Sequence, residues 1–584
     1  MAKSIWLTCF AGVAAVSATT WGYEVFQGPT ELIQYDPAKA FEGYTMFGPQ
    51  SDQNVYLIDM HGQVVHIWPT PEGWPRGVSA THARLLEDGT LERGSGPLFQ
   101  IVDWDNNVIW EHREERPGIT AHHEFRNIWN PKLGARTLMY VASMERTHEE
   151  VLALGADPAV RDDYASEPDG LVEVDMDGNV IWQWNISDHT VNDVNPDLPN
   201  YGVISEHPEK LDPNFGYGVN GSVFGDWMHT NSFDYNEHLD QVVINNSTFS
   251  EFYVIDHGAT FVPGDAERSI ELAASDAGDF IYRWGNACVY DSGDCPSMSD
   301  EGLSSSNGHQ QVFFSHDIQW IDERESASMD EELPGAGNFM IFNNGARQPG
   351  ASYSSVFEID PYDGPREEGR YIPQTVAGFE LTRPVAGGMG AAPQNTSKQI
   401  VWSFSSTLPN AFFSSYIGGA QRLPNGNTLV CSGAQGHLFE VTAEGEVVWE
   451  YVNPVGRARQ RGGGPGGPGG AAGPGGPGGP GGAAGPGGRG GRGGPDGPGG
   501  RGGFGGPGGP GGPGGPGGPG GPGGPGAGSP PQAHEIMRDD VGDSYNAVFK
   551  CQRYSPDYPG LEGKDLTPMG TLTEIFSRRA ANPD

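Results

Sequence analysis

Residues 171–184 read LVEVDMDGNVIWQW, and this stretch decides the fold. Apolar and polar residues alternate on both sides of Asp177-Gly178, which is typical of two antiparallel strands joined by a tight turn. Related stretches that carry tryptophan recur at residues 64–68, 108–110, 180–184, 280–284, 400–402 and 447–449. Sixfold recurrence of one hairpin predicts the blades of a β-propeller rather than an ordinary sandwich.

A second strand pair precedes most of these hairpins, so each blade is predicted to have four strands, named A to D from the axis outward. Five complete sets are expected at residues 82–112, 123–184, 229–284, 316–404 and 420–451. The hairpin at Trp68 and the apolar stretch 547–551 remain, one near each end of the chain. Pairing them in a sixth blade would remove the open sheet edges. The predicted fold class is therefore all-β: a six-bladed β-propeller closed by N- and C-terminal strands.

Composition divides the chain into four segments. Residues 1–18 have the charged start, short apolar run and small-residue end of a secretory signal peptide, so a periplasmic or secreted protein is expected. The propeller is expected over 19–455, interrupted by a Gly/Pro-rich low-complexity insertion over 456–535 that cannot bury a core and is expected to be disordered. Residues 536–584 are expected to supply the closing strand and a tail.

Net charge limits the classes of binding partner, and the cysteine spacing predicts a disulfide. The 34 basic and 75 acidic residues give a net charge of −41, which disfavours nucleic acid and anionic membranes as partners. No segment after the signal is long and apolar enough to span a bilayer. In an oxidising compartment, Cys288 and Cys295 are predicted to close a small loop as a disulfide, whereas Cys431 and Cys551 either pair or remain buried thiols.

Strand direction predicts which residues share one face. If strand A runs from the top of the ring to the bottom, then the starts of the A strands, the B–C connections and the D–A connections all lie at the top. Long insertions are expected in the D–A connections and short turns between C and D. Histidine begins four of the five inner strands, at His82, His123, His229 and His316. These four side chains should therefore point at one axial funnel.

Two further residues are expected at the same mouth, because Arg347 and His437 lie in B–C connections. Several imidazoles and a guanidinium around a dry channel mouth would bind an anion and transfer protons. A structural role for the histidines is the alternative, since propeller repeats also bury histidine.

Several motifs resemble the bacterial arylsulfotransferase (aryl-sulfate sulfotransferase) family. They are DWMHTNS at 226–232, FSEFYVIDH at 249–257, SHD at 315–317, NNG at 343–345 and GAQRLPNGN at 419–427. The resemblance implies an exported six-bladed propeller that moves a sulfuryl group from an aryl sulfate donor to a phenolic acceptor. It further implies a sulfated histidine intermediate, no cofactor and no nucleotide-activated sulfate. The chain contains no Gly-rich Lys-Ser/Thr phosphate loop, which agrees with such chemistry.

The resemblance also implies roles for individual residues. His229 and His316 match supporting catalytic histidines, Arg347 matches a sulfate-holding arginine, and His437 takes the nucleophile's place by chain order. Candidate substrate-binding residues are His82, His123, Asn231 and Asn344. No metal site is expected, the expected partners are small molecules, and the sequence is compatible with a homodimer.

Two other functions fit a propeller with clustered histidines. One is a metal-assisted, polysaccharide lyase-like enzyme in which the histidines hold a divalent cation. The other is a non-catalytic cell-surface binding propeller with the Gly/Pro tract as a spacer.

Overall fold

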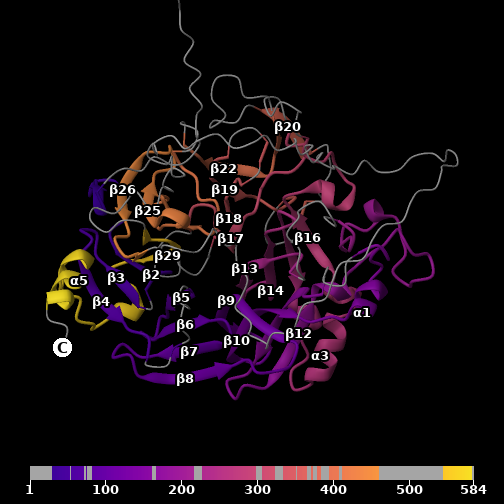
Figure 1. Ribbon diagram of the computed structural model, residues 1–584, viewed down its shortest axis with the longest axis horizontal. Coiled ribbons are helices and arrows are strands. Elements are labelled where there is room, and N and C mark those ends of the chain that lie inside the picture. Colours follow the sequence, from indigo (N-terminus) through magenta and orange to yellow (C-terminus); the bar gives the residue numbers. More distant parts are fainter. Residues whose placement is uncertain are drawn as a thin grey trace, which may run out of the picture.

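Six antiparallel sheets surround a common axis, so the tryptophan repeat predicts the fold correctly (Figure 1). The structure is a computed structural model. It describes residues 29–52, 54–71, 74, 82–160, 166–215, 226–297, 306–321, 333–346, 348–349, 352–364, 370–372, 378–382, 394–406, 411–458 and 544–581.

The first three blades follow the predicted order, with the innermost strand first in the chain. Blade 1 consists of β5 (His82–Leu85), β6 (Leu91–Ser95), β7 (Leu98–Val102) and β8 (Val108–Arg113). Blade 2 consists of β9 (Ile119–Asn130), β10 (Ala135–Met144), β11 (Asp169–Val174) and β12 (Val180–Asn185). Blade 3 consists of β13 (Thr230–Asn236), β14 (Gln241–Asn246), β15 (Glu251–Asp256) and β16 (Phe280–Trp284).

The next two blades keep this order with additions. Blade 4 consists of β17 (His316–Trp320), β18 (Phe339–Asn343), β19 (Ser355–Ile359) and β22 (Ile400–Phe404). Blade 5 consists of β23 (Gly419–Arg422), β24 (Thr428–Ser432), β25 (His437–Val441) and β26 (Val447–Val452), with β1 (Glu31–Tyr35) as a fifth, outermost strand.

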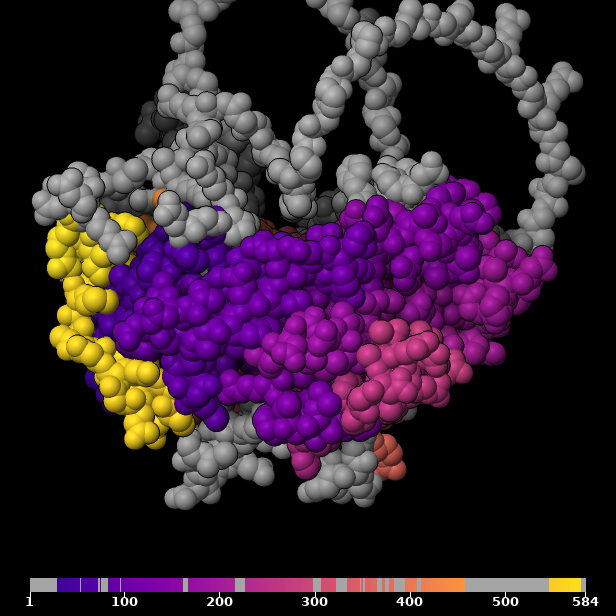
Figure 2. Space-filling view, turned by 90° about the horizontal axis from the view of Figure 1, so that it is seen from below, coloured from indigo at the N-terminus to yellow at the C-terminus, as the bar shows by residue number. Residues whose placement is uncertain are grey.

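Blade 6 closes the ring with strands from both ends of the chain. Its order is β29 (Val548–Tyr554), β2 (Tyr44–Pro49), β3 (Val55–Ile58) and β4 (Val64–Trp68), with β29 innermost. Phe47 pairs with Cys551 across β2 and β29, and with Tyr56 across β2 and β3. The predicted closure is confirmed. In Figure 2 the yellow C-terminal residues lie against the indigo N-terminal ones, and α5 (Leu572–Ala581) packs beside β3 and β4 in Figure 1.

One turn recurs at the bottom of the blades. In the hairpin of Asp175 to Asn179, the Asp175 N–H donates to Asn179 O at 2.9 Å, and Gly178 adopts φ +85°. Glycine meets this left-handed conformation without a Cβ penalty. The same backbone bond from residue i to residue i+4 closes the turns at 59–63, 86–90, 103–107, 423–427 and 442–446.

The repeated tryptophans join each blade to the next. Trp110 of blade 1 donates its indole N–H to Met176 O of blade 2 at 2.7 Å, and Trp449 of blade 5 donates to Met60 O of blade 6 at 2.9 Å. Trp184, Trp284 and Trp402 make equivalent bonds to Gly278 O, Ser397 Oγ and Ala443 O. Trp68 of blade 6 completes the circle with an edge contact to the ring of Trp104 in blade 1, 5.1 Å between centroids. Strand D of each blade, or the tryptophan it carries, thus contacts the C–D connection of the next blade.

The predicted placement of insertions is wrong at three connections. The C–D connections of blades 3 and 4 are long: the first carries α2 (His257–Thr260), α3 (Ala266–Ala273) and the 3-10 turn η3 (Asp276–Gly278), and the second carries β20 (Phe379–Thr382) and β21 (Gln394–Ser397). The B–C connection of blade 2 also carries a helix, α1 (His148–Ala153). Strand β1 was not expected either, because residues 31–35 contain no tryptophan and lie outside the repeated hairpins.

The remaining elements are short. They are β27 (Arg457–Ala458), β28 (Ser544–Tyr545) and the 3-10 turns η1 (Ile186–Asp188), η2 (Ile204–Glu206), η4 (Ala287–Tyr290), η8 (Gly433–Gln435) and η9 (Pro559–Leu561).

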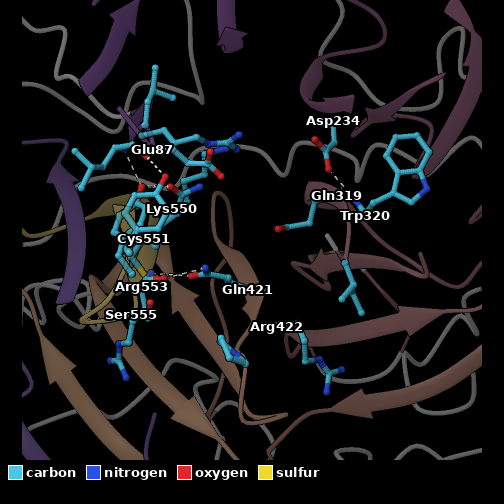
Figure 3. Close-up of a pocket in the computed structure, with 18 of the residues that line it drawn as sticks. Glu87, Asp234, Gln319, Trp320, Gln421, Arg422, Lys550, Cys551, Arg553 and Ser555 are labelled. Carbon is cyan, nitrogen blue, oxygen red and sulfur yellow. Dashed lines mark hydrogen bonds between the residues drawn. The ribbon is translucent and has the colours of Figure 1, made fainter. Parts of the chain in front are cut away.

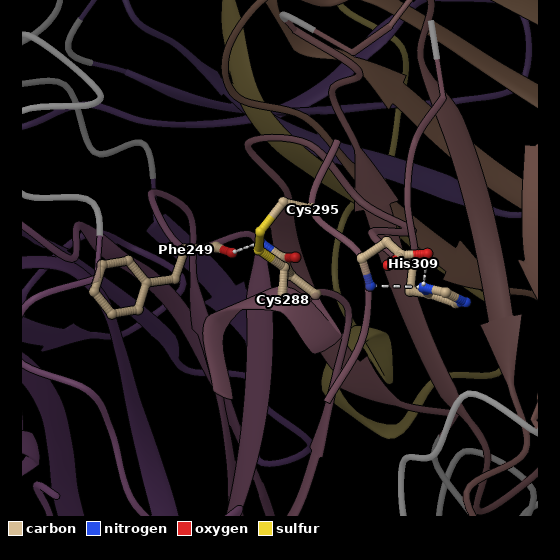
Figure 4. Close-up of a disulfide and its surroundings, with 6 residues drawn as sticks. Phe249, Cys288, Cys295 and His309 are labelled. Carbon is tan, nitrogen blue, oxygen red and sulfur yellow. Dashed lines mark hydrogen bonds and ion pairs between the residues drawn. A yellow bond between two sulfur atoms is a disulfide. The ribbon is translucent and has the colours of Figure 1, made fainter. Parts of the chain in front are cut away.

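Cys288 and Cys295 are joined as a disulfide beyond β16, where His309 accepts a hydrogen bond from the Asp294 N–H (Figure 4). Among the described residues, no helix has the length and apolar character that a bilayer crossing requires.

Candidate functional site

Three histidines of the inner strands contact one phenylalanine of the closing strand, and a fourth histidine contacts one of them. Phe549 of β29 lies 4.3 Å from the ring of His82, 6.1 Å from that of His123 and 6.0 Å from that of His316, measured between centroids. The His123 and His229 rings are 4.7 Å apart and nearly perpendicular. Blades 1, 2, 3, 4 and 6 thus contribute to one axial cluster, hereafter the histidine cluster.

Irregular backbone places these rings at the axis. His123 and His229 adopt left-handed conformations with φ of +52° and +53°, and so does Asp317, directly after His316, at +53°. Strand register shifts at or beside each of these residues, as it does at β-bulges. Such conformations cost about 1–3 kcal/mol each outside glycine and are concentrated at functional sites.

The tautomer of His316 follows from its neighbours. Its Nδ1 lies 2.7 Å from Asn344 Oδ1, and Asn344 Nδ2 donates to Ser414 O and Ile417 O, both at 2.9 Å. Those two carbonyls fix the amide orientation, so the oxygen faces the ring and Nδ1 carries the hydrogen. Burial lowers the pKa of His316 to about 4. At neutral pH its Nε2 therefore has a lone pair.

His229 has the opposite character. Burial opposes its protonation, but the hydrogen bond and charge of Asp226 outweigh that effect and raise its pKa. The His229 Nδ1 and Asp226 Oδ2 atoms are 2.7 Å apart, and the side chain is partly exposed. An aspartate that holds Nδ1 leaves Nε2 directed elsewhere, as a donor while the ring is protonated.

A polar network extends from the cluster toward blade 2. The Nδ1 atoms of His122 and His123 are 2.7 Å apart, and His122 Nε2 lies 2.9 Å from Asp169 Oδ1. The other oxygen of Asp169 accepts from the backbone N–H of Thr230 at 2.6 Å, beside His229. Burial, and then the neighbouring imidazoles, hold the pKa of His123 well below its usual value, so this ring is neutral.

A charged layer lies next along the inner strands, one residue beyond the histidines. Lys550 of β29 forms ion pairs with Glu124 and, at 3.5 Å, with Asp317, and Glu124 lies 3.6 Å from His82 Nδ1. Burial alone would raise the pKa of Glu124, but Lys550 and His82 hold it well below its usual range. Burial raises the pKa of Asp317 despite Lys550. All three side chains are buried.

A cavity of about 1120 Å³ opens on the other side of this layer. Asp317 and Lys550 line it together with residues nearer the far ends of the inner strands, including Gln319, Trp320 and Gln421 (Figure 3). The layer of Glu124, Lys550 and Asp317 therefore separates the histidine cluster from this cavity.

The remaining predicted site residues lie as follows. Asn231 is fully buried and donates to Ser315 O at 2.9 Å, which ties blade 3 to the residue before His316. His437 begins β25, where its Nε2 lies 2.9 Å from Glu450 Oε1 of β26 and its ring contacts Phe439. These contacts place His437 beside the outer strand of its own blade. Arg347 lies outside the described residues.

Sequence reasoning missed Asp226, Glu124 and Lys550. The lysine within the apolar stretch 547–551 could have indicated such a site, because a lysine in a buried strand needs a buried acidic partner. The described residues contain no group of three or more His, Cys, Asp or Glu side chains arranged to hold a metal ion.

Comparison with known proteins identifies the family of the chain. The sequence profile of the arylsulfotransferase (ASST) family matches residues 43–352, just over half of the chain. The chain belongs to the arylsulfotransferase family. The matched region contains His82, His123, His229 and His316, whereas Phe549 and Lys550 lie beyond it.

Two further comparisons concern curated proteins and solved structures that resemble this member of the arylsulfotransferase family. A search of curated proteins finds no match. A protein of unknown function from Bacteroides caccae is 10% identical, with 70% of this chain and 94% of that chain covered and a TM-score of 0.31. The β-propeller domain of Cps50 (Swd1) from Myceliophteria thermophila is 10% identical, with coverages of 72% and 89% and a TM-score of 0.30.

Proposed function

We propose that this arylsulfotransferase-family protein is an exported aryl-sulfate sulfotransferase that moves a sulfuryl group between phenolic compounds, independently of nucleotide-activated sulfate. One observation carries the proposal: a neutral imidazole with a lone pair on Nε2, His316, shares a cluster with a histidine whose pKa is raised, His229. A nucleophile and a proton donor at one mouth are the parts that group transfer needs.

The first half-reaction forms a sulfohistidine. An imidazole nitrogen attacks the sulfur of the aryl sulfate, an N–S bond forms, and the S–O bond to the aryl oxygen breaks. The departing phenolate takes a proton from protonated His229. In the second half, His229 accepts the proton of the incoming phenol, whose oxygen attacks the sulfur and releases the imidazole.

Two histidines are candidates for the nucleophile. The family resemblance favours His437, whose Nε2 faces Glu450. The geometry favours His316, because Asn344 holds its Nδ1 hydrogen and leaves Nε2 as the nucleophilic nitrogen. In either case Arg347, with a permanent cation, would hold the sulfonate oxygens as charge develops on the leaving group.

Export is part of the proposal. The apolar segment within residues 1–18 supports secretion, and the Cys288–Cys295 disulfide suits an oxidising compartment. The net negative charge of the protein would repel anionic aryl sulfates in general. Protonated His229 and Arg347 would offset this repulsion by supplying positive charge at the mouth of the site.

The test uses the full chain and a chromogenic aryl sulfate, with and without an added phenol. We expect a burst of released phenol, faster turnover with acceptor, and a trapped peptide whose mass increases by one SO₃ group. His316→Ala and His437→Ala should separate the two candidates, because loss of the nucleophile abolishes both the burst and the labelled peptide. His207→Ala is the matched control, since His207 is partly exposed and pairs with Glu209 away from the cluster.

If no variant loses the burst, or if turnover requires a stoichiometric metal ion, sulfotransfer through a histidine is wrong. A metal requirement would favour the polysaccharide lyase-like alternative. Absence of any turnover across aryl sulfates, with ligand binding retained, would favour the non-catalytic binding propeller.

A further inference from the structure

Two cysteines outside the histidine cluster face each other across the junction that closes the ring. Cys431 lies in β24 of blade 5, and Cys551 lies in β29, the inner strand of blade 6. Both are buried thiols in the same hydrophobic cluster, which also contains Val548, Leu438 and Phe47.

Backbone contacts set the alignment of these two segments. A Cβ on Gly436 would lie 2.1 Å from Asn546 O, and a Cβ on Gly433 would lie 2.5 Å from Val548 O, so the two backbones touch at both points. The contacts pair residue 436 with 546 and residue 433 with 548, so the two segments run antiparallel to each other. Extending this alignment along both segments brings Cys431 opposite Cys551.

Side-chain contacts agree with the alignment. The Cys431 sulfur lies 3.6 Å from Val548 O, three residues before Cys551 in the same strand. Because both thiols lie in one hydrophobic cluster and the two backbone segments approach this closely, we infer that side-chain rotation can bring the two sulfurs to disulfide geometry.

We propose that Cys431 and Cys551 form a second disulfide, which locks the C-terminal strand β29 onto blade 5. The polypeptide connects β29 to blade 5 only through the long segment between residues 458 and 544. The proposed disulfide would be a second, direct covalent link. The disulfide would therefore hold β29 in the ring, although that long segment separates β29 from the preceding strands of the propeller.

The chemistry is thiol–disulfide exchange with an external disulfide, such as a disulfide oxidase or oxidised glutathione. One thiolate of the pair attacks the external disulfide and displaces a thiolate from it. The second thiolate then attacks the mixed disulfide, so that one bond forms within the protein and two external thiols are released. Burial raises the pKa of the Cys431 thiol well above its usual value, so exchange is expected while β29 docks and not after the core has closed.

The experiment is refolding of the full chain from denaturant with a reduced and oxidised glutathione mixture, followed by alkylation under denaturing conditions and peptide mapping. We expect a cross-linked peptide pair that contains Cys431 and Cys551, and alkylation of neither residue. Peptide mapping also separates this bond from Cys288–Cys295 and from Cys9. The Cys288→Ser/Cys295→Ser variant is the matched control and should still form the cross-link.

Alkylation of both Cys431 and Cys551 after oxidative refolding would overturn the proposal, and so would cross-links from either residue to a different cysteine. The wild-type chain gives this answer even if Cys551→Ala fails to fold. Where Cys551→Ala does fold, the thermal transition of the oxidised wild type should lie several degrees above that of the variant, and addition of a reductant to the denatured wild type before refolding should remove the difference.

Discussion

Single residues decide which imidazole of the cluster is charged. His82, His123 and His316 are held neutral mainly by burial, whereas His229 keeps a raised pKa because Asp226 stabilises its protonated form. A neutral imidazole beside a protonated one therefore requires only one aspartate, next to one of the four rings.

Replacing that aspartate should move the pH dependence. In Asp226→Asn the charge that raises the pKa of His229 is lost, so His229 should deprotonate at lower pH than in the wild type. Titration of the His229 ring by NMR measures the change directly, and the alkaline limb of the pH–rate profile should move down with it. An unchanged His229 titration would show that Asp226 does not set its charge.

The buried charged layer makes a second residue-scale prediction. Lys550→Met removes the nearer cation of Glu124 and leaves only Arg126, whose Nε lies 3.9 Å from the carboxylate. Breaking a buried ion pair costs about 3–5 kcal/mol, so we expect a loss up to that size. Adding Glu124→Gln should recover a large part of that loss. Chemical denaturation of the wild type, the single variant and the double variant measures the free energies of unfolding. A double variant no more stable than Lys550→Met would contradict the pairing.

Most strands of the fold could be predicted from the sequence, but several other elements could not. The alternating pattern and the tryptophans are local signals with a fixed period, so they predict the blades, the closure and the four histidines at strand starts. No local sequence pattern records the bulges at His123, His229 and Asp317. For the same reason α2 and α3, which pack beyond β15, were not anticipated as a C–D insertion, and Lys550 was not paired with Glu124, 426 residues away.

The tryptophan contacts between blades should differ in strength with burial. Trp449→Phe removes a fully buried indole and leaves Met60 O without its donor, so we expect a loss of about 1–3 kcal/mol. Trp402→Phe, whose N–H bond to Ala443 O is exposed, is the matched control and should cost less. Thermal denaturation of both variants tests this, and equal losses would mean that burial does not govern the contact.

At the scale of the whole molecule, one short strand should matter more than a long segment. Truncation after residue 543 removes β29, and with it the inner strand of blade 6, Phe549 and Lys550. We expect this variant to aggregate or remain unfolded. Deletion of residues 464–526 should shift the thermal transition by only a few degrees, because Gly-Gly-Pro repeats bury little apolar surface. A folded truncation, or a deletion that fails to fold, would contradict this assignment.

Closure by the last strand also fixes an order of events during synthesis. A chain that leaves a ribosome or a translocation channel N-terminus first can assemble blades 1 to 5 before residues 548–554 emerge. Until they do, β2 has an unpaired edge, and the four imidazoles lack the aromatic ring and the ammonium group at their centre. A nascent or prematurely terminated chain therefore holds nearly all the strands of the ring but no completed histidine cluster. The architecture itself couples the site to delivery of the full-length polypeptide.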